Sequence, residues 1–184
     1  ISLGLVGSEM CIRDRSRIEQ IQPYWKDDLF QIRQVGRKRA REGSPSRSML
    51  VMLDELPDDA DVLDVGCGDS QDRLFARQLG LIGVGVDLFR PEFTSDFIQG
   101  NVLALPFRSS VIDGIVCHAV TALVKPGDRY EMYGEFFRVL KPGGLLVTAL
   151  YELRYGYSVR PSVEDFRLIE SGFTRRKKAA VYEK

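Results

Sequence analysis

The stretch DVLDVGCGDS, residues 61–70, joins a short apolar run to two glycines separated by a single residue. Residues 62–65 predict a strand buried on both faces, because the apolar run is nearly continuous. Gly66 and Gly68 let the main chain turn sharply, and residues 71–79 carry a helical pattern that stops at the next glycine. A strand, a glycine turn and a helix in this order predict an open parallel sheet, whose ligands bind beyond the carboxyl ends of the strands.

The rest of the chain repeats this alternation of apolar strands and amphipathic helices. Its pattern predicts strands at 82–86, 97–99, 112–117, 145–150 and 174–182, and helices at 44–56, 128–140 and 162–172. Ser44 is the predicted N-cap of the first helix, and KPGG (141–144) is predicted to break the second helix. Ser162 with Asp165 begins the third helix, which is predicted to end at residues 171–172. We therefore expect an α/β fold with a doubly wound, Rossmann-like, mostly parallel sheet and helices on both faces.

The composition restricts the class of protein. At 184 residues the chain has the size of one domain and needs no metal or disulfide to stabilise its core. Lys plus Arg and Asp plus Glu number 26 each, so the molecule carries no excess charge for nucleic acid or a membrane surface. Three cysteines without CxxC spacing argue against a zinc or disulfide framework and favour a reducing compartment, the cytoplasm. No apolar run approaches the ~20 residues of a membrane span.

The first 56 residues divide into two parts. Residues 1–15 resemble a translated sequencing adapter, and we expect them to be a non-native tail. Residues 16–56 are predicted to form a helical and basic segment that precedes the domain at 57–184. Six basic residues stand against a single acid between Arg33 and Arg47. This run is either a solvated loop or a mobile segment that meets an anionic ligand or substrate, and the sequence leaves both interpretations open.

Two acids mark the carboxyl ends of the first two strands. Asp64 lies two residues before the first glycine, and Asp87 lies 23 residues after Asp64. Each alone can be structural, but a carboxylate at the second position can accept both hydroxyls of a ribose, so the pair indicates a nucleoside-containing ligand. A dinucleotide turn carries a third glycine beside the pyrophosphate, whereas here Asp69 and Ser70 open the helix. Asp69 would repel a diphosphate, which disfavours NAD, and Asp64 suits a ligand with an ammonium group.

Four stretches in order resemble the successive motifs of class I S-adenosylmethionine-dependent methyltransferases: VLDVGCGDS, GVGVDL, GNVLALPFRSSVIDGIVCHAV and EFFRVLKPGGLLV. The resemblance extends from about residue 48 to residue 173 and is nearest to the small-molecule enzymes typified by ubiquinone-biosynthesis methyltransferases. It implies a methyltransferase with S-adenosyl-L-methionine as its cofactor and a small or medium-sized molecule as its methyl acceptor. The acceptor itself and the oligomeric state are not implied.

The resemblance also implies a cofactor site at the carboxyl ends of the strands. Its implied cofactor-binding residues are Asp64, Gly66, Cys67, Gly68, Asp87, Leu88, Asn101, Val102, Cys117 and His118. The first four are implied to face the methionyl part of the cofactor, and the next two the ribose hydroxyls and the adenine. Asn101 and Val102 are implied at the adenine edge, and the last two beneath the methionyl end.

The chain departs from the family pattern in three places. Ser70 stands where the family usually has glycine; serine is small and can cap the helix, so we expect modest weakening of binding at most. Asn101 replaces the usual aspartate, and its side-chain oxygen can still accept from the adenine amino group with less charge assistance. The family's sheet ends in an antiparallel hairpin, but only twelve residues follow Gly172, so we expect a hairpin that is abbreviated or truncated.

His118 is the only histidine and a candidate general base, although a lone histidine is more often structural. Tyr133 fits a core position of its helix. It belongs to a cluster of tyrosines at 130, 133, 151, 155 and 157. Of these, Tyr151 and Tyr155, together with Arg154, either line an acceptor pocket or belong to a packed loop.

Two rival functions remain open. An RNA or protein methyltransferase is supported only by the basic run at 33–47. The stretch CHAVTAL (117–123) lacks the asparagine-proline-proline-aromatic signature of enzymes that methylate amino groups of bases. A non-catalytic S-adenosylmethionine-binding protein would keep the cofactor site without turnover. We expect an enzyme with a small-molecule acceptor and no nucleic-acid partner.

Overall fold

The computed structural model describes residues 46, 48–49, 52, 55–68, 72–78, 80–89, 96–118, 120–151, 167–174 and 177–183. In these segments seven strands form one sheet, in the order β3-β2-β1-β4-β5-β7-β6. The strands are β1 (Asp61–Val65), β2 (Ile82–Asp87), β3 (Phe97–Gln99), β4 (Ile112–His118), β5 (Leu140–Tyr151), β6 (Arg167–Thr174) and β7 (Lys177–Glu183). Helix α5 (Asp72–Gln78) connects β1 to β2, and α6 (Arg129–Val139) connects β4 to β5, preceded by the short 3-10 turns η2 (Thr121–Leu123) and η3 (Pro126–Asp128).

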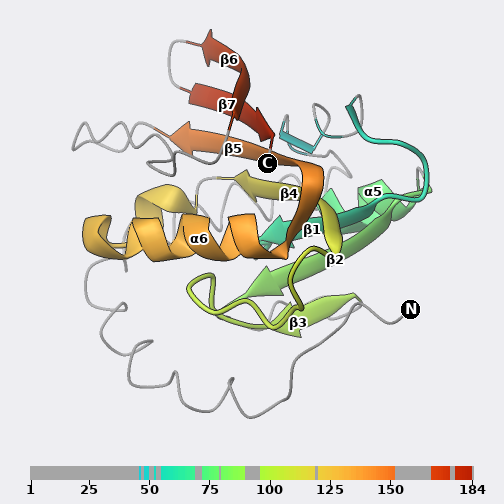
Figure 1. The fold of residues 1–184 in the computed structure, drawn as a ribbon, viewed down its shortest axis with the longest axis horizontal. Helices are drawn as coiled ribbons and strands as arrows, with labels where there is room; N and C mark the ends of the chain where they lie inside the picture. The colour runs from blue at the N-terminus through green and yellow to red at the C-terminus, as the bar shows by residue number, and fades with distance from the viewer. Residues whose placement is uncertain are drawn as a thin grey trace.

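The strand order confirms the doubly wound, mostly parallel sheet. Strands β3, β2, β1, β4 and β5 are parallel neighbours. The chain runs outward from β1 through β2 to β3 and then returns to place β4 on the other side of β1 (Figure 1). The carboxyl ends of β1 and β4 therefore meet where the strand order reverses, which is the place where ligands bind in sheets of this kind.

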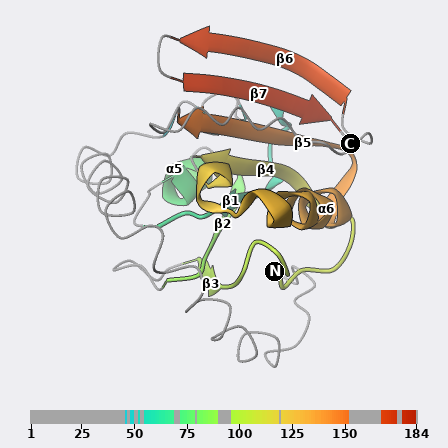
Figure 2. The same cartoon turned by 90° about the vertical axis from the view of Figure 1, so that its left-hand side faces the viewer.

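The far edge of the sheet corrects two expectations. β7 pairs antiparallel with both β5 and β6 (Figure 2), so the hairpin has its two strands and the expected abbreviation was wrong. The helix predicted at 162–172 was wrong over its described part, because residues 167–174 form β6. The helix prediction used local capping residues and spacing, whereas Gly172 pairs with Ala179 across the hairpin. Pairing with a distant segment decides this structure, and local spacing does not report it.

The helix break predicted at KPGG (141–144) is confirmed, since α6 ends at Val139, but the stretch itself lies inside β5, which begins at Leu140 and not at the predicted residue 145. β5 begins at Leu140, which pairs with Ile112, and the next pair joins Leu145 to Gly114. Four residues therefore lie opposite one residue of β4, and Gly143 adopts a φ of 78° among them. The strand absorbs the extra residues as an irregularity at the point where the chain leaves α6.

Apolar side chains form a separate core on each face of the sheet. On the face covered by α6 (Figure 1), Leu63 of β1 belongs to a cluster with Tyr133, which is 1% exposed as its predicted core position requires. On the other face, Val62 of β1 belongs to a cluster with Ala76 of α5 and with Met49. Neighbouring residues of β1 thus face opposite layers, as expected for a strand covered on both sides.

A helical segment before β1 contributes to the second core. Residues 48, 49, 52 and 55 are helical, and Met52 is fully buried against β4. The side-chain oxygen of Ser46 accepts the main-chain N–H of Met49 at 3.1 Å, which is the geometry of an N-cap. The cap predicted at Ser44 is therefore at Ser46. The main-chain N–H of Ser46 also donates to the carboxylate of Asp72, at the start of α5.

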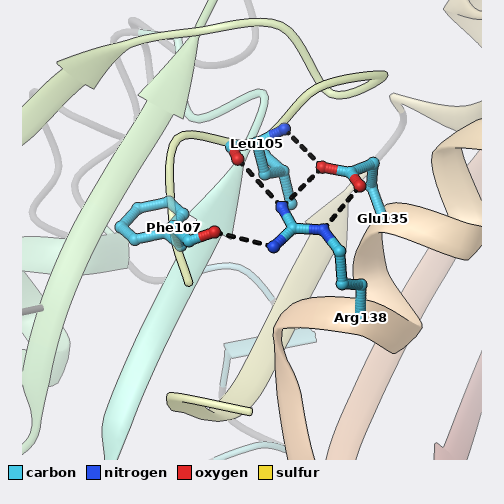
Figure 3. A network of polar contacts seen from close by, with 4 residues as sticks. All are labelled: Leu105, Phe107, Glu135 and Arg138. Carbon is cyan, nitrogen blue, oxygen red and sulfur yellow. Dashed lines mark hydrogen bonds and ion pairs between the residues drawn. The ribbon is translucent and has the colours of Figure 1, made fainter. Parts of the chain in front are cut away.

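Helix α6 is fastened to the segment that follows β3 by a pair of charged side chains (Figure 3). The guanidinium of Arg138 donates to the carbonyl oxygens of Phe107 and Leu105 at 2.8 and 3.0 Å. It also donates to the carboxylate of Glu135, which in turn accepts the main-chain N–H of Leu105 at 2.7 Å. The pKa of Arg138 is raised, chiefly by its hydrogen bonds to Glu135. This pair fixes the position of residues 105–107 relative to α6.

Candidate functional site

The glycine turn after β1 is held against the end of β2. The main-chain N–H groups of Gly66 and Cys67 donate to the carbonyl oxygen of Val86 at 2.7 and 3.2 Å. Gly66 and Gly68 adopt φ values of 67° and 48°, which glycine reaches without steric cost. A Cβ on Gly66 would lie 2.0 Å from Cγ2 of Val120, whereas a Cβ on Gly68 would meet no described atom within 4 Å. The turn is therefore packed at its first glycine and open at its second.

Asp87, the last residue of β2, ties the glycine turn to the next turn. One oxygen of its carboxylate accepts the main-chain N–H of Gly68 at 2.9 Å, and the other accepts that of Phe89 at 2.9 Å. These two hydrogen bonds orient the carboxylate, a group that accepts hydroxyl donors. The side chain is half-buried at the carboxyl edge of the sheet, where a ligand can reach it.

Asp64 places a second carboxylate beneath the same turn. It lies opposite Gly85 of β2 and Val116 of β4, is 3% exposed, and by strand alternation faces the layer of α5. Its Oδ2 atom is buried, and the carboxylate interacts electrostatically with Cys67. The site thus contains a buried carboxylate beneath the glycine turn.

The pKa of Cys67 is affected by the charged side chains around the turn. Burial raises the pKa of its thiol above its ordinary range, and the charges of Asp64 and Asp87 raise it further, while Arg73 opposes them. Its Sγ atom lies only 2.6 Å from where a Cβ on Gly85 would be, so the thiol packs onto β2. The thiol of Cys67 is therefore not available to a ligand.

The implied adenine edge is a compact turn after β3. The side-chain oxygen of Asn101 accepts the main-chain N–H of Leu103 at 3.0 Å. The main-chain carbonyl oxygen of Asn101 accepts the main-chain N–H of Ala104 at 3.0 Å. Asn101 and Val102 are 5% and 8% exposed. Leu88 is half-buried, and its carbonyl oxygen accepts the side-chain amide of Gln99 at 2.9 Å. One acceptor position of Asn101 is therefore already used, and the implied bond to adenine would need its second one.

Cys117 and His118 end β4 and point to opposite faces of the sheet. The thiol of Cys117 is fully buried in the cluster under α6 and lies 3.7 Å from Oγ1 of Thr121. Burial raises its pKa to about 12. His118 faces the other layer, where Nδ1 of its ring lies 3.0 Å from Oγ of Ser48. The structure therefore does not bring the two side chains together, and only His118 has a side chain beside the helical segment before β1.

Several candidate residues fall outside the described part of the chain. They are Asp69, Ser70, Arg154, Tyr155, Tyr157 and the six basic residues of the run at 33–47. Tyr151 is described as the last residue of β5.

The sequence does not predict that two further residues, Val120 and Ser48, belong to the site. Val120 fills the space over Gly66, and Ser48 contacts His118 across 70 positions of the chain. Ser48 falls within a predicted helix, and no spacing in the sequence links it to the end of β4.

Residues 63–148 match the protein-family model described as "Methyltransferase domain". This span covers the carboxyl-end turns of β1, β2 and β4 and all the implied cofactor-binding residues. Among the described residues, no helix is long and apolar enough to cross a membrane.

Two curated relatives are methyltransferases. The chain is 33% identical over 114 residues to the 2-methyl-6-phytyl-1,4-hydroquinone methyltransferase of Synechocystis sp., covering 55% of this chain and 35% of that protein. It is 30% identical over 102 residues to the 24-methylenesterol C-methyltransferase 2 of Oryza sativa, covering 47% and 28%. The chain therefore spans about a third of the length of these relatives.

Solved structures share the fold at low sequence identity. A 1,6-didemethyltoxoflavin-N1-methyltransferase of Burkholderia thailandensis, with bound 1,6-didemethyltoxoflavin and S-adenosylhomocysteine, gives a TM-score of 0.65 at 15% identity over 83% of this chain and 87% of that one. A TehB-like S-adenosylmethionine-dependent methyltransferase of Corynebacterium glutamicum gives 0.64 at 19% identity over 82% and 95%. At these sequence identities the structural similarity supports a shared fold alone.

Proposed function

Because residues 63–148 match the family model of a methyltransferase domain, we propose that the chain is an S-adenosylmethionine-dependent methyltransferase acting on a small or medium-sized organic acceptor. The observation that carries this proposal is the pair of turns joined by Asp87 at the switch point of the sheet. A nucleoside ligand with an amino-acid end requires two such features. One is a glycine turn that is open, here at Gly68, and the other is a carboxylate at the end of the next strand.

The residues present fit this cofactor. Asp87 presents a carboxylate at the edge where the ribose hydroxyls would lie, and the open side of Gly68 lets a ligand approach the turn. The buried carboxylate of Asp64 suits the ammonium group of the methionyl part. Leu88, Asn101 and Val102 would bound the adenine.

The cofactor supplies an activated methyl group on a sulfonium. The chain must therefore bind it, orient the acceptor and, for an acceptor that loses a proton, remove that proton. Orientation alone contributes up to roughly 7–11 kcal/mol to such a reaction, and a general base adds about 10²–10⁴-fold. We assign the base to His118, whose ring lies at the carboxyl end of β4 beside the switch point. Cys117, whose thiol faces the other layer, takes no part in proton transfer.

The acceptor belongs to the class of the curated relatives' substrates. Those relatives are named for a hydroquinone and for a sterol, both largely apolar ring systems, and the sequence motifs resemble the ubiquinone-biosynthesis group. We therefore propose a ring-bearing small molecule in place of a nucleic acid or a protein. The buried, reduced thiols of Cys67 and Cys117 agree with a cytoplasmic enzyme.

Turnover of S-adenosylmethionine to S-adenosylhomocysteine over a panel of hydroquinones, phenols and sterols tests the proposal. The expected result is turnover with at least one ring-bearing acceptor, and His118→Ala should reduce kcat by about 10²-fold or more with little change in cofactor affinity. Equal losses in both would contradict the assignment of the base. Cofactor binding without turnover on any member of a broad panel would favour a non-catalytic binding protein.

A further inference from the structure

A hydrogen bond joins the helical segment before β1 to the end of β4. Oγ of Ser48 lies 3.0 Å from Nδ1 of His118. Ser48 is 1% exposed, so water does not compete for this contact from the serine side. A buried hydroxyl without a partner would cost about 1–3 kcal/mol, so this bond constrains where the histidine ring sits.

Two serines of the same segment make different contacts. Ser46 caps its own helix through Met49 and donates to Asp72, so its contacts fasten the segment to α5. Ser48 lies two residues further on and reaches a ring at the carboxyl edge of the sheet. Both serines are at least 96% buried, and only one of them touches a candidate catalytic group.

We propose that Ser48 is a positioning residue, which holds the ring of His118 and fixes the nitrogen that exchanges protons. The inference rests on the proposed function, in which His118 removes the acceptor's proton. With Nδ1 in contact with Ser48, the proposal assigns proton exchange to Nε2. His118 takes at Nε2 the proton that the acceptor hydroxyl loses as its oxygen bonds the methyl carbon, and the electron pair of the broken carbon–sulfur bond stays on sulfur.

This role requires one tautomer of the neutral ring. For Nε2 to accept a proton, Nδ1 must carry the hydrogen and donate it to Oγ of Ser48. The imidazolium formed by proton transfer also carries a hydrogen on Nδ1, so the same hydroxyl oxygen accepts in both states. The ring therefore keeps its place through the reaction, and the serine contact need not break.

The single histidine of the chain makes this tautomer directly measurable. In the full chain, labelled with ¹⁵N and made without a histidine tag, the ring signals belong to His118 alone. The expected spectrum of the neutral ring shows the hydrogen on Nδ1. A spectrum with the hydrogen on Nε2 would overturn the proposal, and this readout needs no variant.

Variants then separate positioning from folding. Ser48→Ala should lose the Nδ1–H preference, whereas Ser46→Ala should lower the melting temperature and keep the tautomer. With an acceptor from the panel above, Ser48→Ala should reduce kcat by about tenfold or more and change cofactor affinity less than about twofold, and Ser48→Thr should recover part of the loss. An unchanged tautomer or an unchanged kcat in Ser48→Ala would overturn the proposal.

Different results would disprove the proposed function and the positioning role of Ser48. If S-adenosylhomocysteine does not bind the wild-type chain, the proposed function fails whatever the tautomer is. If it binds and turnover is found, but Ser48→Ala keeps full kcat, the methyltransferase stands and the positioning role is wrong.

Discussion

The carboxylate of Asp87 accepts the main-chain N–H of Gly68 at 2.9 Å, across the gap between the ends of β2 and β1. This contact joins the two turns that a nucleoside cofactor would have to touch at once. It also orients the carboxylate before any ligand arrives, which reduces the cost of ordering it on binding.

Replacing Asp87 by Ala should weaken binding of S-adenosylhomocysteine by about tenfold or more, because hydrogen bonds to a charged group contribute about 1.5–3 kcal/mol. Calorimetric titration measures the change. Asp113→Ala is the matched control: Asp113 also accepts a main-chain N–H at 2.9 Å, from Asp61, but near the amino ends of the strands. That variant should keep its affinity, and equal losses in the two variants would contradict the site.

The two glycines of the turn should respond differently to alanine. Gly66→Ala adds a methyl group 2.0 Å from Val120 as well as left-handed strain, so we expect a loss of about 2–5 kcal/mol in the free energy of unfolding. Gly68→Ala meets open space and should cost about 1–2 kcal/mol from strain alone. Denaturant unfolding compares them. Val120→Ala should reduce the cost of Gly66→Ala, and additive effects would argue against this contact.

Arg138→Met should lower the free energy of unfolding by about 2–3 kcal/mol, because the carbonyl oxygens of Leu105 and Phe107 lose their charged donor. Arg138→Lys should recover little of the loss, since an ammonium cannot reproduce the planar fork of the guanidinium. Arg108, an exposed arginine just after this segment, gives the control, and Arg108→Met should change stability by no more than about 0.5 kcal/mol. A similar loss in both variants would mean that the network in Figure 3 contributes nothing specific.

The thiols of Cys67 and Cys117 should resist alkylation in the folded protein. Burial raises the pKa of Cys117 to about 12 and that of Cys67 in the same direction, so few thiolates exist near pH 8. In a Cys11→Ser background, which leaves only these two thiols, labelling by iodoacetamide should be slow until denaturant is added. Fast labelling of the native chain would contradict their burial.

The same two thiols make stability depend on alkaline pH. Because the folded state keeps each thiol protonated above the ordinary value of 9.0, the unfolded chain releases protons first as the pH rises. The thiol contribution is therefore fully present below about pH 9 and should decline above it by up to about 1.4 kcal/mol per pH unit for each thiol. Cys117→Ala should reduce this slope in denaturant titrations at pH 8, 9 and 10, and an unchanged slope would contradict the prediction.

The sequence predicts the centre of the sheet well, because each central strand is short, apolar and bounded by glycine or a charged residue. β1, α5, β2, β3, β4 and α6 all lie within a few residues of their predicted ranges. The far edge was harder to predict: residues 167–174 have helix-like spacing and a strand structure, because β6 is defined by its pairing with β7. KPGG correctly marks the end of α6, but no local pattern shows that β5 already pairs with β4 at Leu140.

For the candidate site, the sequence predicts positions better than contacts. Topology alone places Asp64, Gly68 and Asp87 at one edge, since parallel strands end together. It does not predict that Asp87 binds Gly68, that Val120 fills the space above Gly66, or that Ser48 meets His118. These contacts join residues 19 to 70 positions apart, and no local pattern encodes them.

The most direct test of the central claim is calorimetric titration of the full chain with S-adenosylhomocysteine and, in parallel, with NAD. The account predicts saturable one-to-one binding of S-adenosylhomocysteine, weakened about tenfold or more in Asp87→Ala, and no binding of NAD. Failure of the wild-type chain to bind S-adenosylhomocysteine, or tighter binding of NAD, would contradict the account.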